Sequence, residues 1–358
     1  MINKFKDKKV LITGHTGFKG SWLSLVMHTL GAKVYGISID DLGDNSHYRM
    51  IPSRVYSEDI RMNILERDGL IRAVKRIEPD FLFHLAAQPL VGYSYREPTQ
   101  TFETNAIGSM NVAEALRHLD NNCVAVFVTS DKAYENLEWE FGYREIDRLG
   151  GKDPYSASKA CAEILIRSYF ESFLSTRPNI RIGIGRAGNV IGGGDWAENR
   201  IIPDAFRSWS TDTALNLRSP ESTRPWQHVL EPLFGYVNLA MDLETREENN
   251  GEAFNFGPKT DANLTVNQLI KAIGKQWGGS SKEVILGSNE LFKEAGLLNL
   301  NCDKAHARLS WKPVWNIENT IYYTTQWYNE VVINNRGIEV TQKQINQYIE
   351  DYVRVIVG

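Results

Sequence analysis

A tyrosine and a lysine one helical turn apart are the residues of this chain best suited to chemistry. Tyr155 and Lys159 lie in the segment Tyr155-Ser-Ala-Ser-Lys159, where a spacing of four residues places both side chains on one face of a helix. A phenol ordinarily has a pKa of about 10, and a nearby ammonium group lowers it. Tyr155 could therefore act as a base in hydride chemistry. Tyrosine and lysine at this spacing are also common surface neighbours, so the pair needs support from a second motif.

A glycine triplet near the start of the chain supplies that support. The segment Val10-Leu-Ile-Thr-Gly14 runs on to Gly17 and Gly20, and a helical pattern follows over 18–30. This order predicts a buried strand, a tight turn and a helix whose N-terminus faces the turn. Glycines let the backbone come close to a pyrophosphate, and the helix dipole favours its negative charge. The triplet alone is a weak signal, but together with Tyr155 and Lys159 it indicates a nicotinamide enzyme.

The residues after the second expected strand bear on the choice of nicotinamide cofactor. An acidic side chain there commonly hydrogen-bonds the adenosine ribose. Asp40 lies twenty residues after Gly20 with Asp41 beside it, although Ser38 could occupy the same place by strand register. Two carboxylates would repel a 2′-phosphate, which favours NAD over NADP, unless they form only a solvated acidic loop. His15 is unusual between the first two glycines, and we expect its ring either to crowd the pyrophosphate or to point outward.

The first half of the chain alternates between expected strands and expected helices. Continuous apolar strands in such an alternation predict an α/β fold with a parallel, doubly wound sheet of the Rossmann type. Beyond the strand before the glycines, we expect strands at 33–38, 55–59, 80–85, 123–130 and 180–184, and helices at 18–30, 63–77, 98–118 and 154–174.

The alternation stops after residue 186. We therefore expect residues 1–186 to form the NAD-binding Rossmann domain. Residues 187–358 are expected to form predominantly a smaller, mixed α/β substrate-binding domain, with some segments returning to the sheet. Such a domain would pack over the carboxyl edge of the sheet, where ligands bind in folds of this kind. Within it we expect a loop at 192–196 and helices at 265–277, 318–332 and 340–355.

Composition and charge exclude several other classes of protein. The 358 residues are 42% hydrophobic and 23% charged, which is ordinary for a globular protein, and the net charge of −4 argues against nucleic acid as a partner. No apolar run approaches the roughly 18 residues that a membrane span needs, and the charged start is unlike a signal peptide. Three cysteines far apart in the chain favour a reducing, cytoplasmic location, and seven histidines without paired spacing predict no metal site.

Several independent motifs together resemble one enzyme family. With His84-Leu-Ala-Ala-Gln88 and Thr104-Asn105 added to the motifs above, the chain resembles the extended short-chain dehydrogenase/reductase family over nearly its whole length. Within that family it is similar to the nucleotide-sugar 4,6-dehydratases, and most similar to the branch that acts on CDP-glucose. The closer likeness rests on further motifs at 14–23 (GHTGFKGSWL), 129–134 (TSDKAY), 186–196 (RAGNVIGGGDW), 199–203 (NRIIP) and 224–230 (RPWQHVL).

The resemblance implies an NAD groove that passes over the carboxyl ends of the first strands. In such a groove Asp59 and Ile60 flank the adenine, while Asn105 supports the groove through the backbone. The cofactor-binding residues expected from the motifs are Gly14, His15, Thr16, Gly17, Phe18, Lys19, Gly20, Ser38, Asp40, Asp59, Ile60, Leu85, Ala86, Ala87, Asn105, Thr129, Tyr155 and Lys159.

The resemblance also implies roles for three residues that directly follow the fifth expected strand. Ser130 would assist at the sugar 4-position and Asp131 would donate a proton to the departing 6-hydroxyl group, which requires a raised carboxyl pKa. The dehydratases of this group usually carry glutamate next, as the base that removes the C5 proton, whereas this chain carries Lys132. A lysine can be that base only if its pKa falls from about 10.4; otherwise it stays charged and stabilises the enolate.

The resemblance finally implies a substrate, a product and an assembly. CDP-glucose would be converted into CDP-4-dehydro-6-deoxyglucose and water, for deoxysugar biosynthesis, by a homodimer or dimer of dimers that pairs helices 98–118 and 154–174. A dehydratase for another nucleotide, a 4-epimerase and, remotely, a non-catalytic NAD-binding regulator are the alternatives. Arginine suits the oxygens of a diphosphate because its guanidinium is a planar fork. The expected substrate-binding residues are Gln88, Asn189, Arg200, Arg218, Arg224 and His228.

Overall fold

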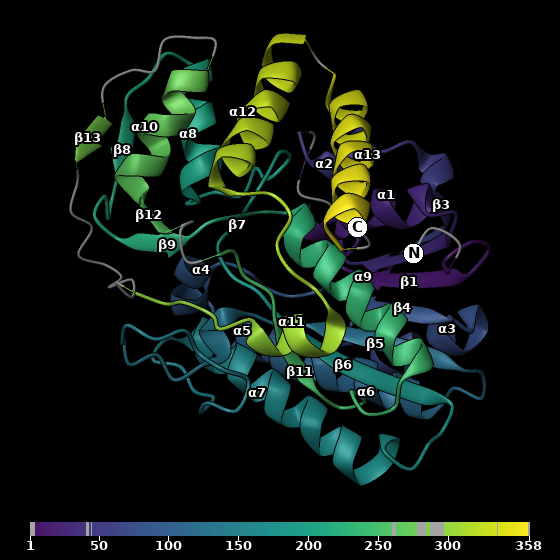
Figure 1. Ribbon diagram of the computed structural model, residues 1–358. Coiled ribbons are helices and arrows are strands. Elements are labelled where there is room, and N and C mark those ends of the chain that lie inside the picture. The colour runs from purple at the N-terminus through teal and green to yellow at the C-terminus, as the bar shows by residue number, and fades with distance from the viewer. Residues whose placement is uncertain are drawn as a thin grey trace.

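A seven-stranded sheet lies at the centre of the computed structural model, which describes residues 4–40, 43, 45–259, 263–277, 284–286, 297–334 and 336–356. All neighbouring strands of this sheet run parallel, in the order β11-β6-β5-β4-β1-β2-β3 (Figure 1). The predicted doubly wound α/β fold is therefore confirmed. The strands are β1 (Lys9–Thr13), β2 (Lys33–Ser38), β3 (Tyr56–Arg61), β4 (Phe81–His84), β5 (Cys123–Val128), β6 (Ile180–Arg186) and β11 (Ala253–Asn255).

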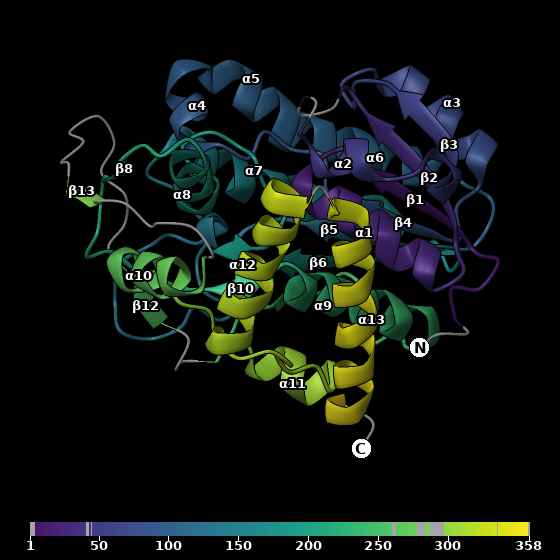
Figure 2. The same ribbon diagram turned by 90° about the horizontal axis from the view of Figure 1, so that it is seen from above.

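Helices cover both faces of the sheet, as Figures 1 and 2 show. Successive residues of a strand point to opposite faces, so Val10 and Ile12 of β1 belong to one apolar cluster and Leu11 belongs to the other. One face carries α3 (Arg67–Ile77), α6 (Gly108–Arg117) and α7 (Pro154–Tyr169), and the other carries α1 (Phe18–Thr29), α9 (Leu230–Thr245) and α13 (Gly337–Ile356).

Two of the expected helices contain a wider turn than the sequence pattern indicates. The helix expected at 98–118 consists of α5 (Pro98–Phe102), a π-helical turn at Glu103–Ile107 and α6, and α7 likewise runs into a π-helical turn at Phe170–Leu174. Asn105 lies inside the first π turn. Such turns are frequent at functional sites because they redirect a side chain without ending the helix.

The second half of the chain contributes to both the sheet and a separate group of small elements. It adds β11 to the central sheet. Its helices α9 and α13 pack on that sheet or on α1. Figure 1 shows β8, β9, β12 and α10 gathered at one side of the sheet. The remaining elements are α2 (His47–Met50), α4 (Val91–Arg96), β7 (Val190–Ile191), α8 (Ile201–Ser210), β8 (Leu215–Leu217), β9 (Thr223–Pro225), β10 (Gln227–His228), β12 (Asn263–Thr265), α10 (Val266–Gln276), β13 (Val284–Leu286), α11 (Asp303–Leu309) and α12 (Ile317–Asn334), with short 3-10 turns at Ser53–Val55 and Asp131–Ala133.

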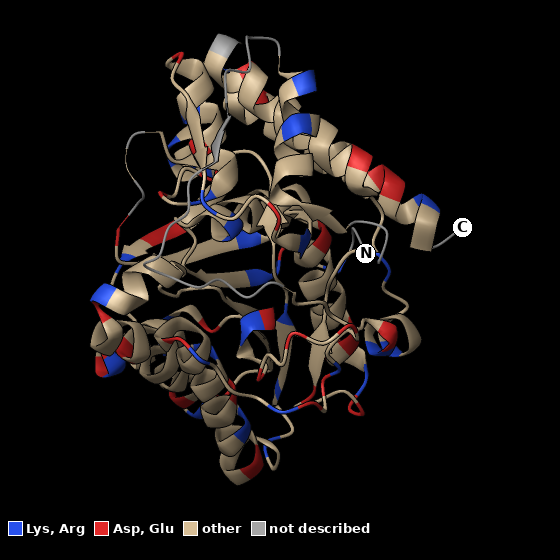
Figure 3. Ribbon diagram, turned by 90° about the vertical axis from the view of Figure 1, so that its left-hand side faces the viewer, with Lys and Arg blue, Asp and Glu red and all other residues tan. Residues whose placement is uncertain are grey.

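On the side that Figure 3 presents, the ribbon positions of Lys and Arg are interspersed with those of Asp and Glu. In the part of the chain that the structure describes, no helix is both long and apolar enough to span a bilayer. Within the same residues, no group of three His, Cys, Asp or Glu side chains is arranged to hold a metal ion.

Candidate active site

The turn between β1 and α1 is packed so closely that side chains in place of its glycines would collide with the backbone. Gly14 adopts a φ of 74°, and a Cβ atom there would lie 2.6 Å from the backbone nitrogen of Ala86. A Cβ atom on Gly20 would lie 2.1 Å from the carbonyl oxygen of Gly14. Gly17 precedes the helix and Phe18 begins it, so the first N–H groups of α1 face this turn without a capping side chain. This cradle fits the pyrophosphate of a dinucleotide.

The end of β2 supplies the expected ribose side of the groove. Thr16 is buried, and its hydroxyl group lies 2.7 Å from the Ser38 hydroxyl and also bonds the backbone carbonyl of Asp40. Because Ser38 is engaged in this way, Asp40 is the better candidate for the ribose contact. Asp40 and Asp59 both border one open groove. Asp41 lies outside the described residues.

His15 does neither of the two things expected from the sequence. Its side chain is fully buried and lies over β2, where a Cβ atom on Gly36 would come within 2.4 Å of the ring. Its Nε2 atom lies 2.9 Å from Oδ1 of Asp59, which precedes Ile60 on β3, and the ring meets Tyr48 edge-on. Burial lowers the pKa of His15. The imidazole therefore positions the carboxylate of Asp59 instead of crowding the glycine turn.

Asn105 fixes the loop at 85–88, which follows β4 and contains Leu85, Ala86 and Ala87. Its Oδ1 atom accepts the backbone N–H of Gln88 (2.8 Å), and its Nδ2 atom donates to the carbonyl of Gln88 (3.1 Å) and to the Ser158 hydroxyl on α7 (2.8 Å). The side-chain amide of Gln88 donates to the Thr101 hydroxyl (2.9 Å) and to the Leu90 carbonyl (3.1 Å). The structure thus gives Gln88 a role inside the loop and does not support the expected substrate contact.

Ser130, Asp131 and Lys132 begin a single 3-10 turn at the carboxyl end of β5. The Ser130 side chain accepts the N–H of Lys132 (3.2 Å), which fixes the turn, and donates to Oδ1 of Asp131 (2.9 Å). Ser130 and Asp131 are both buried, and Lys132 is half-buried. Asn189 has a backbone φ of 53°, and its side chain donates to the other carboxylate oxygen of Asp131 (3.4 Å). A hydroxyl group and a carboxyl group are therefore joined in one short chain of hydrogen bonds.

Tyr155 brings a phenol to the same place from the N-terminus of α7. Burial raises the pKa of Tyr155 to about 12, and a hydrogen bond with Ser130 opposes that effect. Burial lowers the pKa of Lys159, one turn further along α7, to about 8, and the Glu163 carboxylate opposes it. The tyrosine and lysine lie on one helix face as the sequence predicts. The phenol still needs further positive charge to ionise near neutral pH.

Two residues outside the expected catalytic set also face Asp131. Burial and nearby Arg200 lower the pKa of Lys19 on α1 to about 8, while the Asp131 carboxylate opposes them. The Lys19 ammonium lies 6.0 Å from the ring centroid of Tyr236. Tyr236 is fully buried in α9, and its hydroxyl group has no hydrogen-bond partner among the described residues. Because α9 is largely apolar, the sequence pattern does not distinguish Tyr236 from a core residue.

A cavity beside Asp131 is formed largely by the second half of the chain. Arg200 is bonded to Asp195 (2.8 Å), Arg218 donates to the Asn199 carbonyl (2.7 Å), and Arg224 donates to the Thr223 carbonyl (3.0 Å). All three arginines follow β6, so the elements beyond the first Rossmann strands supply the cationic side chains. The residues that line the cavity with Asp131 include Gly188, Gln227, Lys259, Asn263 and Asn299.

Two expected ligand contacts are directed away from these openings. His228 has no exposed surface, its ring lies 5.8 Å from Trp22 and 4.9 Å from Trp315, and burial lowers its pKa to about 3. The Thr129 hydroxyl donates to Glu163 (2.6 Å) and so is directed toward α7. The structure therefore does not support ligand contact by the side chain of either residue. Spacing in the sequence could not reveal this, because tertiary packing decides where each side chain points.

Comparison with known proteins places the chain among the enzymes that its motifs resemble. A family model described as GDP-mannose 4,6 dehydratase matches residues 11–324. The chain belongs to this family. Among its relatives, CDP-glucose 4,6-dehydratase of Salmonella typhimurium is 38% identical over 360 residues, which cover 99% of this chain and 100% of that protein. CDP-paratose 2-epimerase of Salmonella typhi is 29% identical over 74% of this chain and 83% of that protein.

Solved structures of other sugar-nucleotide enzymes share the fold of this dehydratase family member. UDP-glucose 4-epimerase of Thermotoga maritima superposes with a TM-score of 0.79 at 22% identity, over 90% of this chain and 99% of that one. The complex of dTDP-glucose 4,6-dehydratase from Bacillus anthracis with NAD gives 0.75 at 19% identity, over 93% and 99% of the two chains. The family expected from the motifs is confirmed, and so is its fold.

Proposed function

We propose that this protein is an NAD-dependent CDP-glucose 4,6-dehydratase, which forms CDP-4-dehydro-6-deoxyglucose and water. The observation that carries the proposal is the chain of groups from Tyr155 through Ser130 to Asp131, in which a base for one hydroxyl group adjoins an acid for another. The full-length similarity to the Salmonella CDP-glucose 4,6-dehydratase supports CDP-glucose as the substrate. A role in cytoplasmic deoxysugar biosynthesis follows from that substrate.

The cradle between β1 and α1 and the loop at 85–88 would hold NAD. A Cβ atom at Gly14 or Gly20 would collide with the backbone of Ala86 or of Gly14, so glycines are needed for the tight turn that presents the N–H groups of α1 to a pyrophosphate. Asp40 would bond the ribose hydroxyl groups and disfavour a 2′-phosphate. When bound, NAD would supply the acceptor and donor of the hydride that leaves C4 of the sugar and is later added at C6.

The side chains move the protons of the proposed reaction. Tyr155 takes the proton of the 4-hydroxyl group, and the Lys159 ammonium stabilises the phenolate. Asp131 gives its proton to the departing 6-hydroxyl group, which leaves as water. Lys132 stands where the C5 base is expected, and Lys19 offers a second ammonium group facing Asp131. Two lysines thus stand ready to take the C5 proton or to stabilise the enolate.

Counting the protons transferred in one turnover indicates a further role for Ser130. The C5 proton leaves and returns, so it cancels. Tyr155 has then gained one proton and Asp131 has lost one, and both must be restored before the next substrate reacts. Ser130 hydrogen-bonds both groups, so its hydroxyl can pass the proton from the phenol to the carboxylate.

The proposed substrate contacts rest on arginines of the second half of the chain and on Asn189. Arg200, Arg218 and Arg224 would bind the two phosphates, because guanidinium groups suit phosphate oxygens. Asn189 would hold the sugar end, since it already bonds Asp131. A 4-epimerase is the nearest alternative, yet it needs no proton donor at C6, and Asp131 stands in that role.

The test is to incubate the purified protein and NAD separately with CDP-glucose, dTDP-glucose, GDP-mannose and UDP-glucose. We expect the fastest loss of one water molecule with CDP-glucose, followed by mass spectrometry, and a 4-keto, 6-deoxy product by NMR. Inversion at C4 without loss of water would show an epimerase instead. Faster dehydration of another nucleotide sugar would reject the CDP-glucose assignment.

A further inference from the structure

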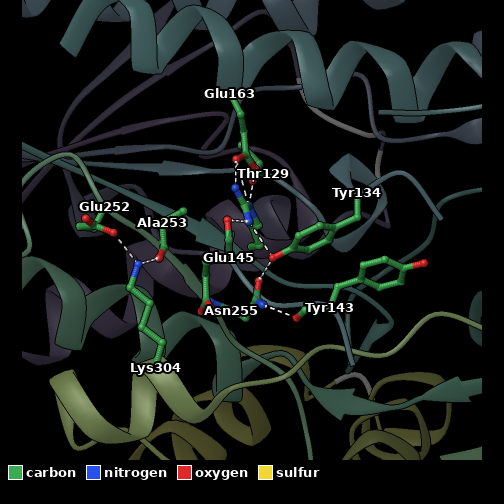
Figure 4. A network of polar contacts seen from close by, with 10 residues as sticks. Thr129, Tyr134, Tyr143, Glu145, Glu163, Glu252, Ala253, Asn255 and Lys304 are labelled. Carbon is green, nitrogen blue, oxygen red and sulfur yellow. Dashed lines mark hydrogen bonds and ion pairs between the residues drawn. The ribbon is translucent and has the colours of Figure 1, made fainter. Parts of the chain in front are cut away.

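We propose that Glu163 and Arg186 are a positioning pair that holds α7 against the catalytic turn after β5 and keeps Lys159 charged. Their side chains are 2% and 4% exposed, and Nη2 of Arg186 lies 2.5 Å from Oε2 of Glu163. Nε of Arg186 lies 2.9 Å from each carboxylate oxygen. Figure 4 shows Glu163 beside Thr129 in a network of polar contacts. The catalytic consequence of the pair rests on the proposed dehydratase function.

Glu163 links the pair to α7. It lies four residues after Lys159, so the two side chains share one face of the helix. The Glu163 carboxylate opposes the effect of burial on the pKa of Lys159. An ammonium group that must stabilise the Tyr155 phenolate has to stay protonated at the working pH. Glu163 supplies the negative charge that favours this state.

The same pair is bonded to both ends of the catalytic turn. The hydroxyl of Thr129, the residue before Ser130, donates to Oε1 of Glu163 (2.6 Å). Nη1 of Arg186 donates to the hydroxyl of Tyr134, the residue that ends the turn (2.6 Å), and this hydroxyl donates to Asn255 of β11 (2.8 Å). A displacement of the pair would therefore move the turn and α7 relative to each other.

The charges in the pair need an explanation beyond packing. Replacing a buried ion pair by apolar residues of similar volume is often neutral or stabilising. Every polar contact of Glu163 described above belongs to Arg186 or to Thr129, the neighbour of the catalytic turn. A role in setting the position and charge of catalytic groups accounts for the pair better than a gain in stability does.

Other charged or titratable groups near Lys159 cannot replace Glu163. Lys19 of α1 also faces Lys159, but it is a cation. His84 of β4 feels the Lys159 charge as well, and burial lowers the His84 pKa to about 3, so its ring is neutral. Among the residues described, Glu163 is thus the carboxylate that acts on Lys159.

The first experiment measures the protonation of Lys159 without substrate. Glu163→Gln keeps the side-chain shape and removes the charge. We follow acylation of Lys159 by acetic anhydride against pH with mass spectrometry. The midpoint is expected near pH 8 in the wild type, since burial lowers the Lys159 pKa to about 8, and at least one unit lower in the variant. The control is Glu252→Gln, because Glu252 pairs with Lys304 of α11 (2.5 Å) and is not among the groups that act on Lys159. Equal midpoints in the wild type and Glu163→Gln would overturn the proposal.

The second experiment separates positioning from a merely structural role. In the wild type, kcat/KM should fall as pH rises above the Lys159 pKa. In Glu163→Gln this fall should occur at lower pH, shifted by the same amount as the acylation midpoint. Thr129→Val and Tyr134→Phe keep the ion pair but cut its links to the turn, so each should lower kcat at least fivefold without shifting the pH at which kcat/KM falls. Unchanged kcat in both variants would reject the positioning role, even if Glu163→Gln failed to fold. If no nucleotide sugar reacts, the function proposal fails, and the acylation result still decides the role of Glu163.

Discussion

At Tyr155 the protein buries a phenol where burial opposes its ionisation. Burial raises the pKa of Tyr155 to about 12, and Arg200 and the Ser130 hydroxyl oppose this effect. Lys159 itself is a cation only up to about pH 8, because burial lowers its pKa. The phenol therefore needs the positive nicotinamide ring of NAD nearby to become a base. This dependence would confine base catalysis to the enzyme with cofactor bound.

Replacing Tyr155 by phenylalanine tests the assignment of the base. Tyr155→Phe removes the group that accepts the 4-hydroxyl proton, and general bases contribute roughly 10²–10⁴-fold. We expect turnover of CDP-glucose to fall at least about a hundredfold, while the NAD dissociation constant measured by calorimetry changes little. Turnover within a few-fold of the wild type would reject Tyr155 as the base.

Asp131 allows oxidation and elimination to be separated. Asp131→Asn keeps the size of the side chain but cannot donate a carboxyl proton to the 6-hydroxyl group. Oxidation at C4 should still occur and water loss should fail, so the near-ultraviolet absorbance of reduced nicotinamide should build up after substrate is added. Stopped-flow absorbance follows this directly. Normal turnover without that build-up would show that another group is the acid.

At this scale local spacing predicted where the candidate catalytic residues lie, but it did not predict the orientation of His15. Tyr155 and Lys159 share a helix face, and Ser130 and Asp131 follow a strand, so short-range geometry determines where they lie. The orientation of His15 depends on Gly36 and Asp59, which are distant in the sequence. Spacing along one segment holds no information about such partners.

At the scale of elements, alternation in the first half predicted the sheet because each strand there is a continuous apolar run. Helix α9 escaped prediction because apolar residues surround it on most sides, so no amphipathic stripe marks it. The strand β11 has only three residues, too few for a pattern. The π turn at Glu103–Ile107 depends on its packing against α7, which the helical period cannot show.

The buried carboxylate of Glu231 links α9 to the start of α12 and to α13 through hydrogen bonds. Glu231 on α9 accepts the backbone N–H groups of Val314 (3.0 Å) and Trp315 (2.6 Å), which precede α12, and the hydroxyl of Tyr348 on α13 (2.8 Å). Burial raises the pKa of Glu231 to about 7, above its ordinary value. The folded state thus binds a proton more readily than the unfolded state, so this group lowers stability as pH rises towards 7.

Glu231→Gln removes this titration and tests the link. Between pH 5 and pH 8 the wild type should lose on the order of 2–3 kcal/mol more of its free energy of unfolding than the variant does. Urea unfolding followed by tryptophan fluorescence at both pH values measures the difference. Glu248→Gln is the control, because the Glu248 side chain is 70% exposed. Parallel pH dependence in the wild type and Glu231→Gln would show that the buried carboxyl group does not titrate in this range.

At the scale of the whole molecule, apolar side chains remain exposed on the side of the sheet covered by α6 and α7. Ile107 is 41% exposed in the π turn before α6, Ile164 is 57% exposed on α7, and Phe173 is 41% exposed just beyond α7. α7 contacts both α6 and that π turn. Exposed apolar residues on neighbouring helices are typical of an interface between protein chains.

We therefore predict a dimer with two-fold symmetry in which α6 and α7 of each copy pack against the same helices of the other. Ile164→Asp places a charge on this face and should convert the dimer into a monomer, as measured by light scattering at micromolar concentration. Ile146→Asp is the matched control, because Ile146 is 84% exposed in a loop before α7 and should leave the dimer intact. A monomeric wild type, or dissociation by the control alone, would contradict the prediction. If the dimer forms through this face, each active site keeps its own catalytic turn, since Ser130, Asp131 and Tyr155 come from one chain.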